Sequence, residues 1–189
     1  AHNSIKPTAS SINFLHDLTL ANLGVGGAII DTAGFDVTVS QLLTDNGGNV
    51  TKNGAGTLTL TAANNYAGAT TVNGGVLAVT TDSAAGSTGG YTVASGAKLA
   101  VKVQLANAQL NTASLAFNSG ATALDVDLGG FGNPTAAPIN LSGALGVNGT
   151  VTVNLADTLP QLGQFPLIKY GTKTGAGSFV LGALPTGVV

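Results

Sequence analysis

Two carboxylates separated by one residue, Asp125 and Asp127, are the residues of this chain whose type and spacing best suit chemistry. They alternate with Leu124, Val126 and Leu128, which is typical of a strand with one buried face. Because residues i and i+2 of a strand share a face, the two carboxylates would lie roughly 6.5 to 7 Å apart. That separation suits an inverting glycosidase or one side of a calcium site. Acids that alternate with buried residues are also typical of a solvated strand face. We favour this second interpretation and expect no catalytic, cofactor or metal site, with this pair as the sole metal candidate.

The other residues with reactive side chains are dispersed along the chain. His2 and His16 stand apart from the alternating segments, and we interpret them as surface residues. No serine lies in a nucleophile-elbow context, and the glycine-rich segment 24–27 lacks the lysine and following helix of a phosphate-binding loop. Pectate-lyase-like chemistry would need clustered aspartates beside a basic residue, typically arginine, and the chain has no arginine. The remaining candidate acids stand singly near turns, where aspartate bonds to local backbone: Asp31, Asp36, Asp45, Asp82 and Asp157.

The composition predicts an all-β protein. Only 7% of the 189 residues are charged, and Glu, Arg, Cys, Met and Trp are absent, so β-branched residues and turn formers replace the usual helix formers. The formal net charge of −2, without a cluster of lysines, excludes nucleic acid as a partner. No apolar run approaches the ~18 to 20 residues of a membrane span. The first residues, Ala1 to Ser4, are polar and unlike a signal peptide, so in an exported protein we expect Ala1 to follow a cleavage site or an internal cut.

Short alternating segments recur every ~20 to 27 residues, the length of a solenoid coil. Within 54–79 we expect strands at 57–61, 70–72 and 76–79, joined by corners rich in glycine and asparagine, with no helix between them. At this period the chain makes roughly eight coils, in a rod on the order of 40 Å long. We expect a loop or an outer strand at 103–111. The alternating segments lie at 35–39, 58–60, 77–79, 99–101, 124–128 and 151–155.

The alternation also assigns each side chain to the inside or the outside of the coil. We expect the inward residues to be almost all Val, Leu, Ile, Ala or Phe, and the outward face to carry rows of threonine. Outward threonine ladders occur in ice-binding solenoids, but the coil lengths here vary too much for a registered array. We therefore interpret them as ordinary polar residues of exposed strands. The rows are Thr57/Thr59/Thr61, Thr70/Thr71, Thr80/Thr81 and Thr150/Thr152.

The segment 54–79, GAGTLTLTAANNYAGATTVNGGVLAV, closely resembles the autotransporter-associated (passenger-associated transport) β-strand repeat. It departs from that repeat at Ala62, Asn65, Ala67 and Ala69, which leave the strand pattern intact. From residue 115 onward the chain resembles the closing section of autotransporter passengers, with an N-P, an I-N-L-S-G and an L-I-K-Y-G segment. The resemblance implies a right-handed parallel β-helix from the passenger domain of a Gram-negative autotransporter, secreted or displayed on the cell surface. It further implies a repeat region at 1–114 and a C-terminal section at 115–189 that continues the same β-helix.

These observations predict a structural role. We expect a cell-surface or extracellular rod, such as an adhesin-like stalk or passenger fragment, that is not an enzyme. One alternative is a filament subunit that associates head to tail through open β-helix ends. The other is a polysaccharide-degrading β-helix enzyme. We expect a surface or polysaccharide ligand of unknown identity.

Overall fold

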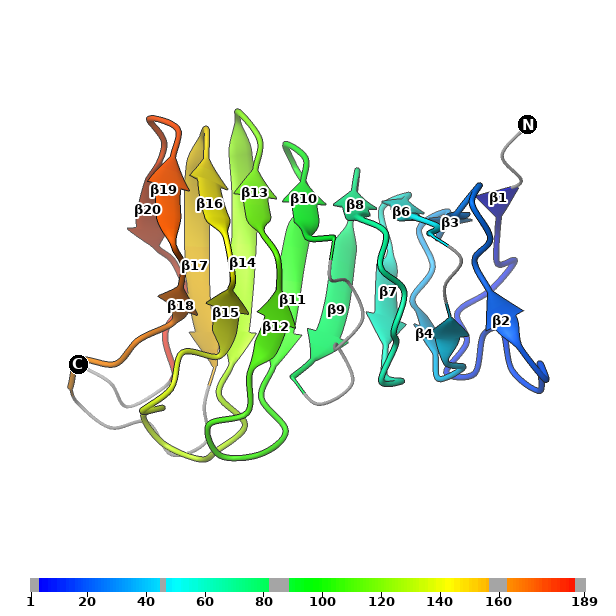
Figure 1. The fold of residues 1–189 in the computed structure, drawn as a ribbon, viewed down its shortest axis with the longest axis horizontal. Coiled ribbons are helices and arrows are strands. Elements are labelled where there is room, and N and C mark those ends of the chain that lie inside the picture. The colour runs from blue at the N-terminus through cyan, green and yellow to red at the C-terminus, as the bar shows by residue number, and fades with distance from the viewer. Residues whose placement is uncertain (1–3, 45–46, 82–88, 157–162, 186–189) are drawn as a thin grey trace.

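The computed structural model describes residues 4–44, 47–81, 89–156 and 163–185. Every regular element in these ranges is a β-strand, and every strand pairing is parallel. Figure 1 shows the strands side by side along a rod, with the first strands at one end and the last strands at the other. The prediction of an all-β parallel β-helix is therefore confirmed.

Two long sheets form two faces of the rod, and shorter sheets form a third. Sheet A contains β1 (Ser4–Ile5), β3 (Ala28–Asp31), β6 (Val50–Asn53), β8 (Thr70–Val72), β10 (Tyr91–Val93), β13 (Leu115–Phe117), β16 (Ala144–Val147) and β19 (Thr172–Thr174). Sheet B contains β4 (Val37–Val39), β7 (Thr57–Leu60), β9 (Val76–Thr80), β11 (Lys98–Lys102), β14 (Ala121–Asp127), β17 (Thr150–Ala156) and β20 (Ser178–Leu181). The third face contains β2 (Ala21–Asn22) with β5 (Leu43–Thr44), and β12 (Leu110–Thr112) with β15 (Ile139–Leu141) and β18 (Ile168–Lys169).

The chain makes about seven turns, each of which adds one strand to both long sheets. The turn between Val50 and its partner Thr70 takes 20 residues, whereas the turn between Leu115 and Leu145 takes 30. The later turns are longer than the sequence pattern indicated because a loop at 128–138 separates β14 from β15. At 103–108 the chain forms the expected loop and then enters β12.

The core follows the alternation along each strand. Leu58 and Leu60 of β7 are buried, as are Leu124 and Val126 of β14, whereas the residues between them are partly exposed. Stacking in register converts these positions into continuous rows, and one row joins Leu58, Leu77, Leu99, Leu124 and Val153. Each fully buried side chain of this kind contributes ~1.5 to 3 kcal/mol relative to exposure. A single coil could not bury its own row, so stacking supplies the stability.

The corner between sheets A and B is tight enough to require glycine. At the corner 73–75 between β8 and β9, Gly75 has a φ of +61°, a conformation that L-residues rarely adopt. A Cβ on Gly75 would also meet the carbonyl oxygens of Ala55 and Gly56 in the preceding coil. Close stacking of successive corners therefore selects glycine here.

The expected sides of two threonines were wrong. Thr70 and Thr81 are buried on the inner side, although the sequence analysis placed them in outward rows. Thr80 is also buried, but it lies in the outward row with Lys102 and Asp127. The Thr70 hydroxyl lies 2.8 Å from the hydroxyl of buried Tyr66, and Thr81 accepts a hydrogen bond from the backbone of Gln104 at 3.2 Å. Inside the coil these polar groups are therefore satisfied locally, which makes their burial tolerable.

Candidate functional site

Asp125 and Asp127 lie on the outer side of β14, beside two lysines of the neighbouring strand β11. Lys98 Nζ is 2.8 Å from one Asp125 oxygen, and Lys102 Nζ is 3.1 Å from one Asp127 oxygen. Asn154, on the next strand, donates to the other Asp125 oxygen at 2.6 Å. Each carboxylate is therefore already engaged by a cation from one neighbouring coil. In the part of the chain that the structure describes, no group of three or more His, Cys, Asp or Glu is placed to hold a metal ion.

The remaining sequence candidates within the described residues each have a local partner of their own. Lys6 Nζ lies 2.8 Å from Asp31, and the Thr57 backbone N–H donates to Asp36 at 2.7 Å. Chiefly because of these hydrogen bonds, the pKa of each carboxyl is lowered from its ordinary value. His16 pairs with exposed Asp17 at 2.6 Å. Segment 24–27 is a turn that closes on itself through a Gly27 N–H to Gly24 hydrogen bond. His2, Asp45, Asp82 and Asp157 lie outside the described residues.

Lys52 on β6 is the residue whose role the sequence analysis missed, because its side chain points into the coil and is fully buried. Its neighbours in the same row of sheet A are Ile30 and Val72. The three N–H groups of the ammonium are shared among four oxygens within 3.0 Å of the nitrogen: Thr32 Oγ1 and the carbonyl oxygens of Asn53, Gly54 and Gly74. These partners belong to three successive coils. Lys52 therefore connects three coils at the corner between sheets A and B.

Burial changes the acid–base behaviour of this amine. Removal from water disfavours the charged form and lowers the pKa of Lys52 from 10.5 to about 8, although Asp31 and Asp36 act in the opposite direction. Four oxygen partners satisfy the ammonium, and no partner is a carboxylate at hydrogen-bond distance. Because the Lys52 ammonium is enclosed by these oxygens, its role is structural rather than catalytic. The alternation of the sequence could have predicted the inward position of Lys52, because Lys52 lies two residues after inward Val50.

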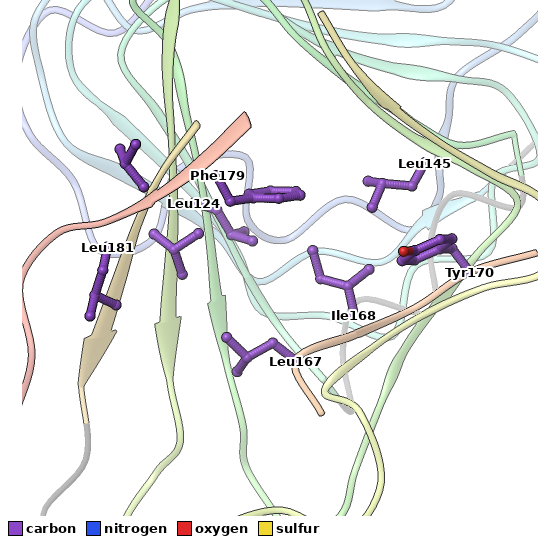
Figure 2. A pocket seen from close by; sticks show the side chains of 9 residues that line it. Leu124, Leu145, Leu167, Ile168, Tyr170, Phe179 and Leu181 are labelled. Atoms are coloured by element: carbon purple, nitrogen blue, oxygen red, sulfur yellow. The ribbon is translucent and has the colours of Figure 1, made fainter. Parts of the chain in front are cut away.

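An apolar depression lies beside the last strands that the structure describes. Its volume is about 440 Å³, and its lining includes Leu124 of β14, Ile168 of β18, Tyr170, Phe179 and Leu181. Figure 2 shows these side chains around one opening, with Ile168 and Tyr170 opposite Phe179 and Leu181. The Phe179 ring also packs edge-on against Phe117 of the interior, with ring centroids 6.3 Å apart. The lining of this depression is thus apolar and packs against the hydrophobic core, which does not suit it to polar chemistry.

The fold and these sites define a β-solenoid in which several outer charges are paired between coils. Residues 50–79, from β6 through most of β9, match a family model described as the Passenger-associated-transport-repeat. A curated protein, the adhesin BmaC autotransporter of Brucella suis biovar 1 (strain 1330), is 39% identical over 90 residues. The aligned part is 47% of this chain but only 3% of that protein. No solved structure matches the chain.

Together the repeat, the relative and the parallel coils make this chain similar to the passenger repeats of autotransporters. The matched repeat contains Lys52 and Gly75, which both constrain the corner between sheets A and B. The described residues contain no helix long and apolar enough to cross a bilayer.

Proposed function

We propose that the chain is a structural segment of a cell-surface adhesin, a rod whose folded coils themselves present an adhesive surface away from the cell. The observation that carries the proposal is the unbroken parallel stacking of sheets A and B around one apolar core. Such stacking gives a stiff element whose length grows by ~4.8 Å for each coil. The adhesin relative supports the same role.

Engagement of the acidic pair supports a non-enzymatic role. A glycosidase would need one carboxyl in a desolvated position as an acid. Asp125 and Asp127 are instead on an outer strand face and are paired with lysines. We therefore regard the polysaccharide-degrading alternative as the weaker one. If the chain turned over a uronate polysaccharide, and if Asp125→Asn or Asp127→Asn abolished that turnover, the enzymatic alternative would be favoured instead.

Adhesion can be tested with the purified chain on beads. The native chain, attached through one cysteine introduced at exposed Leu105, should retain beads on cultured epithelial cells under shear. Beads that carry the same chain with Leu58→Asp, which disrupts the core, should wash off like uncoated beads. Retention that does not depend on folding, or no retention at any coating density, would contradict an adhesive role and leave only that of a spacer.

A further inference from the structure

A polar groove of about 210 Å³ lies where the third face of the rod meets sheet A. Its lining consists of Asn111, Thr112, Ala113, Asn140 and Ser142. The passages from β12 to β13 and from β15 to β16 are stacked at this corner, and the Gly143 N–H donates to the Ala113 carbonyl at 2.8 Å. Both β13 and β16 lie between other strands of sheet A, so the groove does not arise from either end of the described chain.

A row of polar side chains in register borders this groove. Asn111 of β12 is the partner of Asn140 of β15, and Asn140 is the partner of Lys169 of β18. These strands lie side by side on the third face (Figure 1). The residues of the row are exposed or partly exposed, whereas their neighbours on β12 and β15 are buried. The row therefore faces solvent along the side of the rod.

The two asparagines of the row hold each other in place. The Asn140 amide donates to Asn111 Oδ1 at 2.8 Å. This bond uses one of the two N–H groups of Asn140 and one of the two lone pairs of the Asn111 oxygen. A ligand would therefore meet amide groups that are already oriented, which lowers the entropic cost of binding. Oriented amides suit a ligand that carries many hydroxyl groups.

The size and lining of the groove fit one unit of a polysaccharide. The lining has amide, hydroxyl and methyl groups but no aromatic or large aliphatic side chain, on which protein interfaces depend. Its volume lies below the ~300 to 1,000 Å³ of sites for drug-sized ligands, which leaves room for a single sugar ring. Stacked strands are ~4.8 Å apart, close to the length of one unit in an extended polysaccharide. A sugar chain laid along the row would thus place one unit beside each coil.

Lys169 gives the row one positive charge. It is the only charged residue among the described strands of the third face, which are β2, β5, β12, β15 and β18. An ammonium group forms stronger hydrogen bonds with anionic oxygens than with neutral ones. The row therefore favours a sugar chain with acidic groups over a neutral chain.

We propose that this groove and its row bind an acidic polysaccharide that lies along the rod. Sugar hydroxyl groups bond Asn111 and Asn140, and one acidic group pairs with Lys169. The inference rests on the proposed adhesive function, whose ligand class it names. Its test measures the binding of free oligosaccharides rather than the retention of beads, so a failure of adhesion and a failure of this site are distinguishable.

Isothermal titration calorimetry with three oligosaccharides provides the test. Two are acidic, hexagalacturonate and a chondroitin sulfate hexasaccharide, and cellohexaose is neutral. At least one acidic oligosaccharide should bind the native chain, and cellohexaose should bind about tenfold more weakly or less. Lys169→Met should weaken the acidic ligand about tenfold and remove the salt dependence of its affinity. Asn140→Ala should weaken it about 3- to 10-fold.

Asn73→Ala is the matched control, because the Asn73 amide donates to Asn53 at 3.0 Å in the same way but at the corner between sheets A and B. It should bind the acidic ligand like the native chain, and circular dichroism should show native strand content in all variants. The proposal would be overturned if neither acidic oligosaccharide bound at millimolar concentration. Equal affinity for cellohexaose, or an equal loss of affinity in Asn73→Ala, would also overturn it.

Discussion

Deprotonation of buried Lys52 gives the most specific prediction for the interior. The folded pKa is about 8 and the ordinary value is 10.5, so between these two pH values the unfolded chain holds a proton that the folded chain has released. Stability rises with pH wherever the unfolded state binds more protons. The free energy of unfolding should therefore increase as the pH rises above 8.

The size of this increase follows from the two pKa values. The difference between the folded and the ordinary pKa of Lys52 corresponds to a gain of about 3 kcal/mol in the free energy of unfolding if the pH crosses the whole interval between them. Between pH 7 and pH 9.5 the same values give about 2 kcal/mol. Desolvation is the main cause of the lowered pKa, and any water that reaches the amine reduces it, so we lower the expectation to about 1 to 2 kcal/mol. Above pH 10 the ionisation of tyrosine opposes the trend, because burial raises the pKa of Tyr66 to about 12.

Urea unfolding between pH 7 and pH 9.5 provides the assay. The native chain should gain stability across this range, and Lys52→Met should lose that gain because it removes the titrating group. Lys169→Met is the control, since Lys169 is exposed and should leave the gain intact. A native chain whose stability stays flat, or a Lys52→Met variant with the same slope as the native chain, would refute the reasoning.

Three further substitutions test the core, the corner and the outer ion pairs. Leu58→Asp should lower the free energy of unfolding by about 3 to 5 kcal/mol, because it buries an unpaired charge. The same change at the adjacent outward Thr59 should cost less than about 1 kcal/mol. Equal costs would contradict the sides that we assign to these two residues. Gly75→Ala should cost about 2 kcal/mol or more, and Gly96→Ala only about 1 kcal/mol, since both have positive φ but only Gly75 has backbone in the path of a Cβ. In a double-mutant cycle, Lys98 and Asp125 should couple by less than about 1 kcal/mol and more weakly in salt, and a calcium-dependent rise in melting temperature would instead support a metal site.

The sequence was sufficient to predict the repeat because the alternation of its strands and the residue types of its corners both indicate the same coil. Alternation of leucine with threonine at 57–60, followed by glycine and asparagine corners, allowed few structures other than short strands in a coil. The strands at 70–72 and 76–80 occur where this pattern predicted them, with one additional residue in the second.

The buried polar residues were harder to predict because residue type conflicted with position. Alternation put Lys52 on the side of Val50 and Thr70 on the side of Val72, but lysine and threonine are typical of exposed faces. Adjacent Thr70 and Thr71 cannot both point outward on a strand, so the period of two predicts the burial of Thr70 better than residue type does. The oxygens that make burial of Lys52 tolerable come from residues up to 22 positions away, and a sequence pattern does not reveal such contacts.

Distances along one outward row of sheet A test the stacking of parallel coils most directly. The row has one residue in each successive coil, and these residues are Ile29, Thr51, Thr71, Thr92, Ala116, Gly146 and Thr174. The chain has no native cysteine to interfere with labelling. Spin labels on cysteine pairs can be measured by double electron–electron resonance. The separations from Thr174 to Thr51 and to Ile29 should be about 24 and 29 Å, which is five and six steps of ~4.8 Å. Separations that do not increase by one strand spacing for each coil would contradict the account.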